Sequence, residues 1–311
     1  MDEYLRLENI NKAYEGKKAV NNLTLSVPQG AIYGIIGPNG AGKTTTIRMI
    51  MDIIAPDSGD ILLEGKKIST DYKNRVGYLP EERGLYPKMT LDEVITYLAE
   101  LKGWPRSKTS EVIDGWLEKM SLGDYKLKKV EELSKGMQQK LQFVTTLIHR
   151  PSLVILDELF SGLDPLNIEL IKNILLEEKR RGTTILFSTH VMEQAEKLCD
   201  YICMINSGEK VLDGSLAEVK SRFGTDSIQV DMEGDGAFVR DIPGVEKMIE
   251  FNNYIELKLT PGADKRNILK IISEKVAVRR FEIMEPSLYD IFINVAGVKP
   301  EEVRSGGEAD V

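Results

Sequence analysis

Apolar residues recur with two different spacings along the first two thirds of the chain. Segments 5–10 and 23–27 alternate apolar and polar residues, which predicts half-buried antiparallel strands. Continuous apolar runs, typical of strands buried on both faces, occupy three further segments: 31–36, 153–156 and 184–187. Helical segments follow the first two runs, at 44–51 and 165–180. This alternation predicts an α/β domain with a parallel sheet and crossover helices.

A helical insert interrupts this alternation. Between residues 91 and 122 the apolar positions recur at intervals of three and four, which predicts helices and no strand. We therefore expect an all-helical subdomain at about residues 86–150. The pattern changes again near Phe223-Gly224-Thr225, so the first domain is expected to cover residues 1–222.

The C-terminal part predicts a small α+β module over residues 225–298. Its expected elements are strands at 228–232, 245–250, 254–259 and 278–284, and helices at 265–275 and 287–295. Asn252-Asn253 fits a hairpin turn. The order suggests a split βαββαβ, ferredoxin-like sandwich. Residues 299–311 are polar and glycine-rich, which is typical of a disordered tail.

Composition indicates a globular protein that functions in the cytoplasm. The chain has 311 residues, enough for about two domains, of which 42% are hydrophobic and 29% charged. Its 41 basic and 49 acidic residues leave a net charge of −8, which disfavours binding to nucleic acid. Cys199 and Cys203 are too few for a disulfide framework and are expected to be buried core thiols. No apolar stretch approaches the roughly 18 residues of a membrane span, and the acidic N-terminus is unlike a signal peptide.

A glycine-rich loop connects the apolar run 31–36 to the helix at 44–51. Its residues are Gly37, Pro38, Asn39, Gly40, Ala41, Gly42, Lys43 and Thr44, followed by Thr45. They fit the phosphate-binding pattern G-x-x-x-x-G-K-[ST], in which glycines let backbone N–H groups converge on phosphate oxygens. We expect Lys43 to reach the β- and γ-phosphates of a nucleotide and the Thr44 hydroxyl to bind Mg²⁺. A chance glycine-rich turn is the alternative, and the strand–loop–helix context argues against it.

Carboxylates and a histidine follow the other two buried runs. Asp157 is placed to hold Mg²⁺, directly or through water, and Glu158 to act as the general base that polarises an attacking water. An acidic pair at a strand end is common and indicates little by itself. Behind a phosphate-binding loop, the same pair indicates a metal and catalytic site. His190 lies just past the run 184–187, where a side chain can meet the γ-phosphate, although histidines at strand ends are more often structural.

Two further segments narrow the class of protein. Leu133-Ser134-Lys135-Gly136-Met137 opens a predicted helix, with Ser134 as a good N-cap. Ser161-Gly162-Leu163-Asp164 follows Glu158. Together with the phosphate loop, Asp157-Glu158 and His190, in this order, these segments resemble the ATP-binding cassette (ABC) ATPases. The resemblance covers about residues 4–216.

The resemblance implies a head-to-tail dimer with two ATP molecules at its interface. Ser134 and Gly136 of one chain would close on the γ-phosphate bound by the other, and Asp164 would contact the opposite subunit beside the site. Tyr14 is similar to the aromatic residue on which the family stacks adenine. His190 would hold the γ-phosphate or the attacking water. The helical insert is similar to the subdomain that receives coupling helices from membrane partners.

Three departures from the family pattern bear on the chemistry. Lys135 replaces a glycine of the Leu-Ser-Gly-Gly-Gln signature and adds a positive charge near the phosphate. Glu81 stands where a glutamine is usual, among the catalytic residues. It can bind Mg²⁺, but when ionised it cannot donate a hydrogen bond to water. Leu159 replaces a common proline, from which we expect only local backbone freedom.

These observations predict the ATPase subunit of an ABC transporter. Such a subunit binds ATP and Mg²⁺ on the inner face of the cell membrane and drives a separately encoded membrane permease. The segment Leu79–Pro87, the Leu-Ser-Lys-Gly-Met signature and the appended module resemble the efflux branch, including sodium and drug exporters, so export is favoured over import. The alternative is a soluble ABC ATPase acting on the ribosome or on DNA. The single cassette, the lack of coiled-coil or zinc insertions and the negative net charge disfavour it. A third class, which binds ATP without turnover, would need to lack Glu158.

Overall fold

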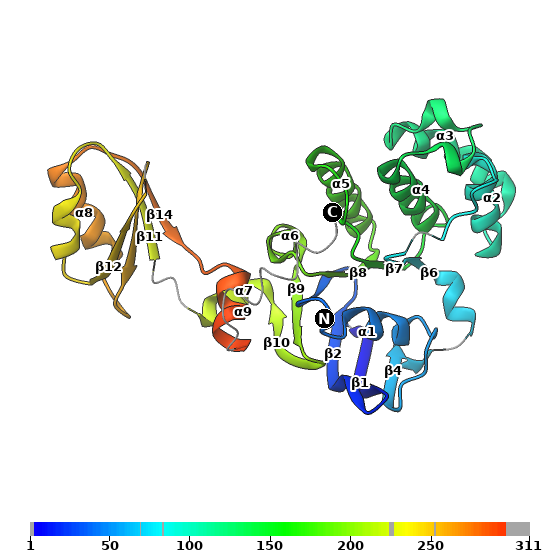
Figure 1. The fold of residues 1–311 in the computed structure, drawn as a ribbon, viewed down its shortest axis with the longest axis horizontal. Helices are drawn as coiled ribbons and strands as arrows, with labels where there is room; N and C mark the ends of the chain where they lie inside the picture. The colour runs from blue at the N-terminus through cyan, green and yellow to red at the C-terminus, as the bar shows by residue number, and fades with distance from the viewer. Residues whose placement is uncertain (1–2, 69, 83, 224–226, 252, 297–311) are drawn as a thin grey trace. The chain divides into compact units, whose positions relative to one another are not determined.

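The computed structural model describes residues 3–68, 70–82, 84–223, 227–251 and 253–296 (Figure 1). The chain forms two compact units, Met1–Leu216 and Ala217–Gly297. This division falls at the start of helix α7 (Leu216–Arg222), earlier than the composition change near Gly224. Residues 224–226 and the tail 299–311 lie outside the described part of the chain.

A six-stranded sheet with the order β10-β9-β3-β8-β7-β6 forms the centre of the first unit. Its strands are β3 (Ile32–Ile36), β6 (Val76–Leu79), β7 (Leu153–Asp157), β8 (Thr184–Thr189), β9 (Tyr201–Asn206) and β10 (Glu209–Ser215). All neighbours are parallel except β10, which runs antiparallel to β9. Every residue of β3, β7 and β8 is buried, so the continuous apolar runs are strands covered on both faces, as predicted. Because these three strands are parallel neighbours, their carboxyl ends meet at one edge of the sheet.

Helices α1 (Lys43–Ile50), α5 (Pro165–Arg180) and α6 (Met192–Leu198) follow β3, β7 and β8. They confirm the predicted alternation of strands and crossover helices. Helix α5 begins and ends at the predicted residues. Two sequence signals define its start. Asp164 caps it by accepting a hydrogen bond from the N–H of Asn167, and Pro165 occupies the first helical position, where no N–H is needed.

A second, antiparallel sheet has the order β2-β1-β4-β5. Its strands are β1 (Glu3–Tyr14), β2 (Lys17–Pro28), β4 (Ser58–Leu63) and β5 (Lys66–Lys67). In β2, Leu23, Leu25 and Val27 are buried and the residues between them are partly exposed, which confirms the half-buried strand that the alternation predicts. One apolar cluster contains this buried face, the inner residues of the six-stranded sheet and the buried side chains of α1.

The segment between β6 and β7 is helical, as the apolar spacing predicts. It contains α2 (Leu91–Leu101), α3 (Arg106–Lys119) and α4 (Lys135–Leu147). The short 3₁₀-helices of the chain are η1 (Thr70–Arg75), η2 (Gly123–Tyr125), η3 (Val130–Glu132) and η4 (Ala237–Asp241). Thr90 and Glu93 form a capping box at the start of α2, with reciprocal N–H···O distances of 3.3 and 2.8 Å. Of the helices in the described residues, none combines the length and the apolar character that crossing a membrane requires.

The second unit is built on a four-stranded antiparallel sheet. Its strands are β11 (Ser227–Met232), β12 (Val245–Glu250), β13 (Ile255–Leu259) and β14 (Val278–Met284), and its α-helices after α7 are α8 (Lys265–Lys275) and α9 (Leu288–Ala296). The strand order β12-β13-β11-β14 is that of a split βαββαβ module. However, the first crossover carries only η4 in place of an α-helix, since Gly234, Gly236 and Gly244 interrupt this segment. Asn252 of the expected hairpin turn is outside the described residues.

This unit has a hydrophobic core of its own. Ile228 and Val230 of β11 and Leu257 of β13 are fully buried and pack in one cluster with Ile268 and Ile272 of α8. Leu257 lies opposite Ile228 on one side and Met248 on the other. The centre of β13 therefore holds the sheet to its helix.

Replacing Leu257 by alanine tests this core. We expect a loss of about 2–5 kcal/mol in the free energy of unfolding of the second unit, because a buried leucine leaves a cavity. Native-state hydrogen exchange of the β11 and β13 amides measures the change. The matched control is Lys258→Ala at the exposed neighbouring position, for which we expect a change within about 0.5 kcal/mol. Equal effects of the two substitutions would show that Leu257 contributes no core packing.

Candidate active site

Two glycines fix the backbone of the loop that follows β3. A Cβ atom at Gly37 would lie 2.1 Å from the carbonyl oxygen of Ile205, and one at Gly42 would lie 2.3 Å from that of Ala19. Gly42 also has a φ of 106°, in the region that favours glycine. Helix α1 begins at the next residue, Lys43. The loop can therefore turn into the helix only where these positions lack side chains.

Lys43 is almost fully buried, with 5% of its surface exposed. Its ammonium group donates hydrogen bonds to the carbonyl oxygens of Gly37 at 2.9 Å and Pro38 at 3.1 Å. A carboxylate oxygen of Glu158 lies 3.3 Å from the same nitrogen. The loop therefore holds a buried positive charge that a carboxylate from the end of β7 partly balances.

A cavity of about 240 Å³ opens beside this loop. Its lining consists of Asn39, Gly40, Gly42, Lys43, Thr44 and Thr45 with Ala19, Glu81 and Glu158. Pro38 contributes only its carbonyl group to Lys43, and Ala41 is buried in the core behind the loop. Most of the loop residues selected from the sequence thus surround one hollow, together with both glutamates.

Asp157 is completely buried at the end of β7. Its Oδ1 accepts hydrogen bonds from the hydroxyls of Ser188 at 2.5 Å and Thr44 at 3.3 Å. Burial raises the pKa of this carboxyl above its ordinary value, and these two hydrogen bonds oppose the rise only in part. Its Oδ2 is buried and has no hydrogen-bond partner among the described residues.

The free carboxylate oxygen fits a divalent cation. Mg²⁺ prefers oxygen ligands and is commonly held by one or two carboxylates plus substrate phosphates. Asp157 and the Thr44 hydroxyl offer such oxygens side by side. No group of three or more His, Cys, Asp or Glu side chains able to hold a metal occurs in the described residues. Phosphate oxygens and water would have to complete the coordination of an ion at this position.

Glu158 has an unusual backbone conformation. Its φ of 49° lies in the left-handed region, which costs free energy for any residue other than glycine. Its N–H donates to the Ser188 hydroxyl at 3.2 Å. Burial raises the pKa of its carboxyl, but the hydrogen bond to His190 and the Lys43 charge outweigh burial, and the net pKa is lowered. Glu158 therefore remains ionised at neutral pH.

Sequence reasoning missed Ser188. Its hydroxyl donates to Asp157 and accepts from the N–H of Glu158, so it holds both acidic residues from the neighbouring strand. The register of the parallel pair places Ser188 opposite Asp157. Aligning the two apolar runs as parallel neighbours could have found it.

His190 and Glu81 approach Glu158 from different segments. The Nδ1 atom of His190 lies 3.0 Å from Glu158 Oε2, and this hydrogen bond raises the pKa of the imidazole. Glu81 is exposed in the loop after β6. Both Glu81 and Glu158 line a further cavity of about 360 Å³, whose other residues are Leu79, Pro80, Glu82, Gln139, Gln142, Asp157 and Ser161. The ends of β3, β6, β7 and β8 thus bring the predicted phosphate, metal and base residues to one place.

Known proteins are similar in sequence to both units of this chain. Residues 20–161 match the family described as ABC transporter, and residues 214–296 match the C-terminal domain of DrrA1-3-like ATP-binding proteins. An uncharacterized ABC transporter ATP-binding protein of Bacillus subtilis, YhaQ, is 41% identical over 293 residues, which cover 94% of this chain and 98% of that protein. The linearmycin resistance ATP-binding protein LnrL of the same organism is 30% identical, covering 94% and 98%. The chain belongs to the ABC transporter ATP-binding proteins.

A solved structure supports the same conclusion for the fold. The ATP-binding subunit of an ABC transporter superposes with a TM-score of 0.67 at 31% identity, covering 71% of this chain and 93% of the other. The predicted fold class, an ABC cassette, is confirmed. As a member of an ATPase family, the cassette binds nucleotide.

Several predicted residues of the cassette lie away from these cavities. Ser134 caps α4 by accepting a hydrogen bond from the N–H of Met137 at 3.3 Å, and Lys135 and Gly136 form the first turn of this helix. Asp164 caps α5, and the hydrogen bond from the Asn167 N–H lowers the pKa of its carboxyl. Tyr14 is 47% exposed at the end of β1. None of these residues lines either cavity that contains Glu158.

The two cysteines belong to the interior of the cassette. Cys199 and Cys203 are free and buried, as predicted, and burial raises the pKa of each thiol well above its ordinary value.

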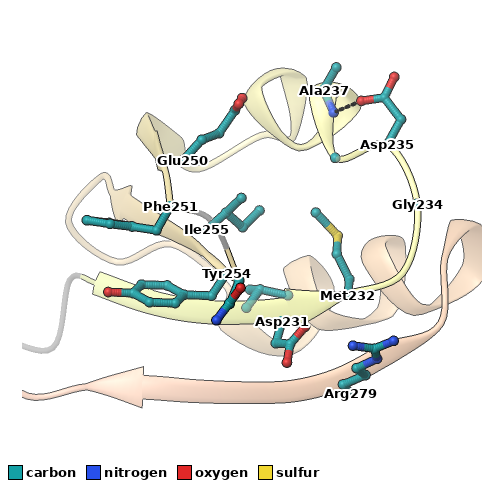
Figure 2. Close-up of a pocket in the computed structure, with 13 residues that line it drawn as sticks. Asp231, Met232, Gly234, Asp235, Ala237, Glu250, Phe251, Tyr254, Ile255 and Arg279 are labelled. Carbon is teal, nitrogen blue, oxygen red and sulfur yellow. Dashed lines mark hydrogen bonds between the residues drawn. The ribbon is translucent and has the colours of Figure 1, made fainter.

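A larger cavity, of about 710 Å³, lies in the second unit (Figure 2). Phe251 and Tyr254 stack at one side of it, with ring centroids 4.7 Å apart, and Met232 extends into its middle. Asp235 accepts a hydrogen bond from the N–H of Ala237, and Arg279 donates to Glu233 outside the lining. Among its described lining residues there is no serine, cysteine, histidine or lysine. Its titratable lining side chains are Asp231, Asp235, Glu250, Tyr254 and Arg279.

The two histidines of the chain allow a direct test of the pair formed by Glu158 and His190. In the nucleotide-free and metal-free protein, we expect NMR titration to show one imidazole with a pKa above 6.5, that of His190, and one at about 4, that of buried His149. In Glu158→Gln the His190 pKa should fall towards 6.5, while His149 serves as the internal control. An unchanged His190 pKa would contradict the pairing.

The raised pKa also sets the sign of a stability effect. Because the folded-state pKa of His190 exceeds its unfolded value, the charged imidazole contributes its full stability below about pH 6.5, as long as Glu158 stays ionised. This contribution is lost as the pH rises through the folded-state pKa.

Proposed function

We propose that the chain hydrolyses ATP to power export of a substrate through a separate membrane subunit. The observation that carries the hydrolytic part is the position of Glu158. Its carboxylate lies between the Lys43 ammonium and His190, at the wall shared by both cavities of the cassette. An ionised carboxylate beside a phosphate-binding loop can accept a proton from water.

The loop residues would bind the nucleotide. The N–H groups of residues 37–45 and the Lys43 ammonium would hold the β- and γ-phosphates. Thr44, Asp157 and Glu81 would hold Mg²⁺, which when bound neutralises charge that develops on the phosphates. Phosphate oxygens compete with Glu158 for Lys43, which frees Oε1 of Glu158 to take the proton of the attacking water. His190, bonded to Oε2, would keep the carboxylate oriented towards the γ-phosphate.

Two chains would complete each site. Ser134 is exposed at the N-terminus of α4, a helix end that favours an anion, and Lys135 adds a positive charge beside it. Since neither lines the cavities of its own chain, we assign Ser134, Lys135 and Gly136 to the γ-phosphate of a partner cassette in a head-to-tail dimer. Asp164 would contact the opposite subunit, and Tyr14 would stack on adenine.

The relatives support coupling to a membrane subunit and export. One solved relative, cbiO1 from Clostridium perfringens, is described as part of the ABC transporter complex cbiONQ, and it superposes with a TM-score of 0.63 at 26% identity over 70% of this chain and 91% of that chain. The Nod factor export ATP-binding protein I of Burkholderia orbicola is 37% identical, covering 75% of this chain and 78% of that protein. The name of this relative states export, and the name of LnrL states resistance to linearmycin, which fits removal of a compound from the cell. We propose the same direction here.

The helical segment offers a surface for the membrane subunit. Tyr86 and Tyr97 contact each other edge-on with centroids 5.3 Å apart, and both are partly exposed, as is Leu101 of α2. Exposed apolar side chains gathered on one segment are typical of an interaction site. The cassette would thus lie against the inner face of the membrane.

Replacing Glu158 by glutamine tests the base. We expect steady-state ATP hydrolysis to fall about 100-fold or more, because the amide cannot accept the proton, while ATP binding is retained and a closed dimer accumulates. Lys43→Ala is the comparison, since it should abolish ATP binding as well. Phosphate release, ATP binding by calorimetry and light scattering measure the three quantities. Undiminished hydrolysis by Glu158→Gln would remove Glu158 from the base role.

Recovery of the tagged chain from its own cells in mild detergent tests the coupling. We expect a stoichiometric membrane protein with many spans to co-purify and to be identified by mass spectrometry. Substituting Tyr97 and Leu101 by serine should reduce this recovery, while Ile53→Ser, at an exposed apolar position outside the helical segment, should not. Recovery of ribosomal or DNA-repair proteins alone would favour the soluble alternative and contradict the transport role.

A further inference from the structure

Helix α4, which begins at the proposed phosphate contact Ser134, presents two buried glutamines towards the catalytic loops. Gln139 and Gln142 are 7% and 6% exposed and lie three residues apart, hence on one face of the helix. Both line the 360 Å³ cavity together with Glu81 and Glu158. Gln139 follows the Leu133–Met137 segment closely, but the sequence assigned neither glutamine a role.

Each glutamine bonds the backbone beside one of the two glutamates. Gln139 donates from Nε2 to the carbonyl oxygen of Leu159 at 2.5 Å. Gln142 donates to the carbonyl oxygen of Glu82, in a longer bond of 3.4 Å. Because a carbonyl can only accept, the amide of Gln139 must direct its NH₂ group to Leu159. One helix face thus holds the residues that immediately follow Glu158 and Glu81.

The hold on Leu159 matters because of the backbone at Glu158. A non-glycine residue with a φ of 49° stays in that conformation only when its surroundings impose it. The Ser188 hydroxyl restrains the N–H of Glu158 on one side. On the other side, the Glu158 carbonyl accepts a hydrogen bond from the N–H of Ser161 at 3.1 Å, and Gln139 holds the following carbonyl, that of Leu159. Leu159 does not fix its own φ as a proline would, so these two hydrogen bonds supply the restraint.

We infer that Gln139 is a positioning residue for ATP hydrolysis, which keeps the Glu158 carboxylate aimed at the reaction by holding the Leu159 carbonyl. The inference rests on the proposed role of Glu158 as base. It also assigns two roles to α4. The helix carries the proposed phosphate contact Ser134 at its start, and it positions Glu158 through Gln139. The amide oxygen of Gln139 is buried and has no hydrogen-bond partner among the described residues. Burying an unpaired oxygen is unfavourable, so the bond that the amide nitrogen makes to Leu159 is what justifies a glutamine here.

The test separates turnover from binding in the full-length chain. Gln139→Met keeps the length of the side chain and removes the N–H donor. We expect kcat per ATP site to fall about tenfold or more, because small displacements of a reacting group are costly, while the Kd for ATP stays within about twofold. Gln139→Leu, which is apolar and also lacks a donor, should act in the same direction. It serves as the second variant should the methionine variant fail to fold.

Thr145→Val is the matched control, since Thr145 is a buried polar residue of α4 whose hydroxyl, among the described residues, bonds within the helix to the Gln142 carbonyl. It should keep both kcat and Kd. Wild-type turnover with an unaffected kcat in both Gln139 variants would overturn the positioning role and leave the proposed function intact. The positioning role would also be overturned if Thr145→Val lowered kcat as much as the Gln139 variants do, or if the Gln139 variants lost ATP affinity as much as they lost kcat. Absence of turnover in the wild-type chain would overturn both.

Discussion

The buried ammonium of Lys43 is the charge on which the rest of the site depends. A buried cation is costly unless it is paired and hydrogen-bonded, and this one has two loop carbonyls and the carboxylate of Glu158 as partners. The loop can offer those carbonyls because Gly37 and Gly42 allow the backbone to pass against neighbouring chain segments. Glu158 can reach the cation because β7 and β3 end at the same edge of the sheet. The position of one charge thus requires both the loop sequence and the strand order.

Much of this follows from the sequence because the determining interactions are local. Residues close together in the chain determine the strand–loop–helix around Lys43 and the capped start of α5 at Asp164. They also determine the buried runs at β3, β7 and β8. Contacts between distant segments were harder to foresee. The hydroxyl of Ser188 acts on residues of another strand, and Gln139 bonds a loop twenty positions away. The left-handed backbone of Glu158 has no local sequence signal, since no glycine marks it. In the second unit, the order of elements suggested a βαββαβ module, but glycines leave its first crossover without an α-helix.

The substitution of a glutamate for the usual glutamine at position 81 changes the balance of charge in the cassette. Glu81, Asp157 and Glu158 border the 360 Å³ cavity, whose described lining has no lysine, and Lys43 lines the 240 Å³ cavity with Glu81 and Glu158. The added negative charge makes the hollow more attractive to a divalent cation and less so to a polyphosphate alone. Nucleotide and metal are therefore expected to enter together, as a complex whose negative charge the metal has partly neutralised. Because Glu81 is exposed, solvent screening moderates this preference.

The burial of both cysteines has a practical consequence for following the motions of this protein. Cys199 and Cys203 lie in the interior of the cassette with pKa values raised far from the reactive range, so thiol reagents meet protonated and inaccessible sulfur atoms. A cysteine introduced at an exposed position can accordingly carry a spectroscopic label with no background from the native thiols. Slow labelling of the native pair would in turn report the rare opening of the cassette itself. The native cysteines thus give no background signal when a label is introduced elsewhere, and the rate at which they themselves are labelled reports how often the cassette opens.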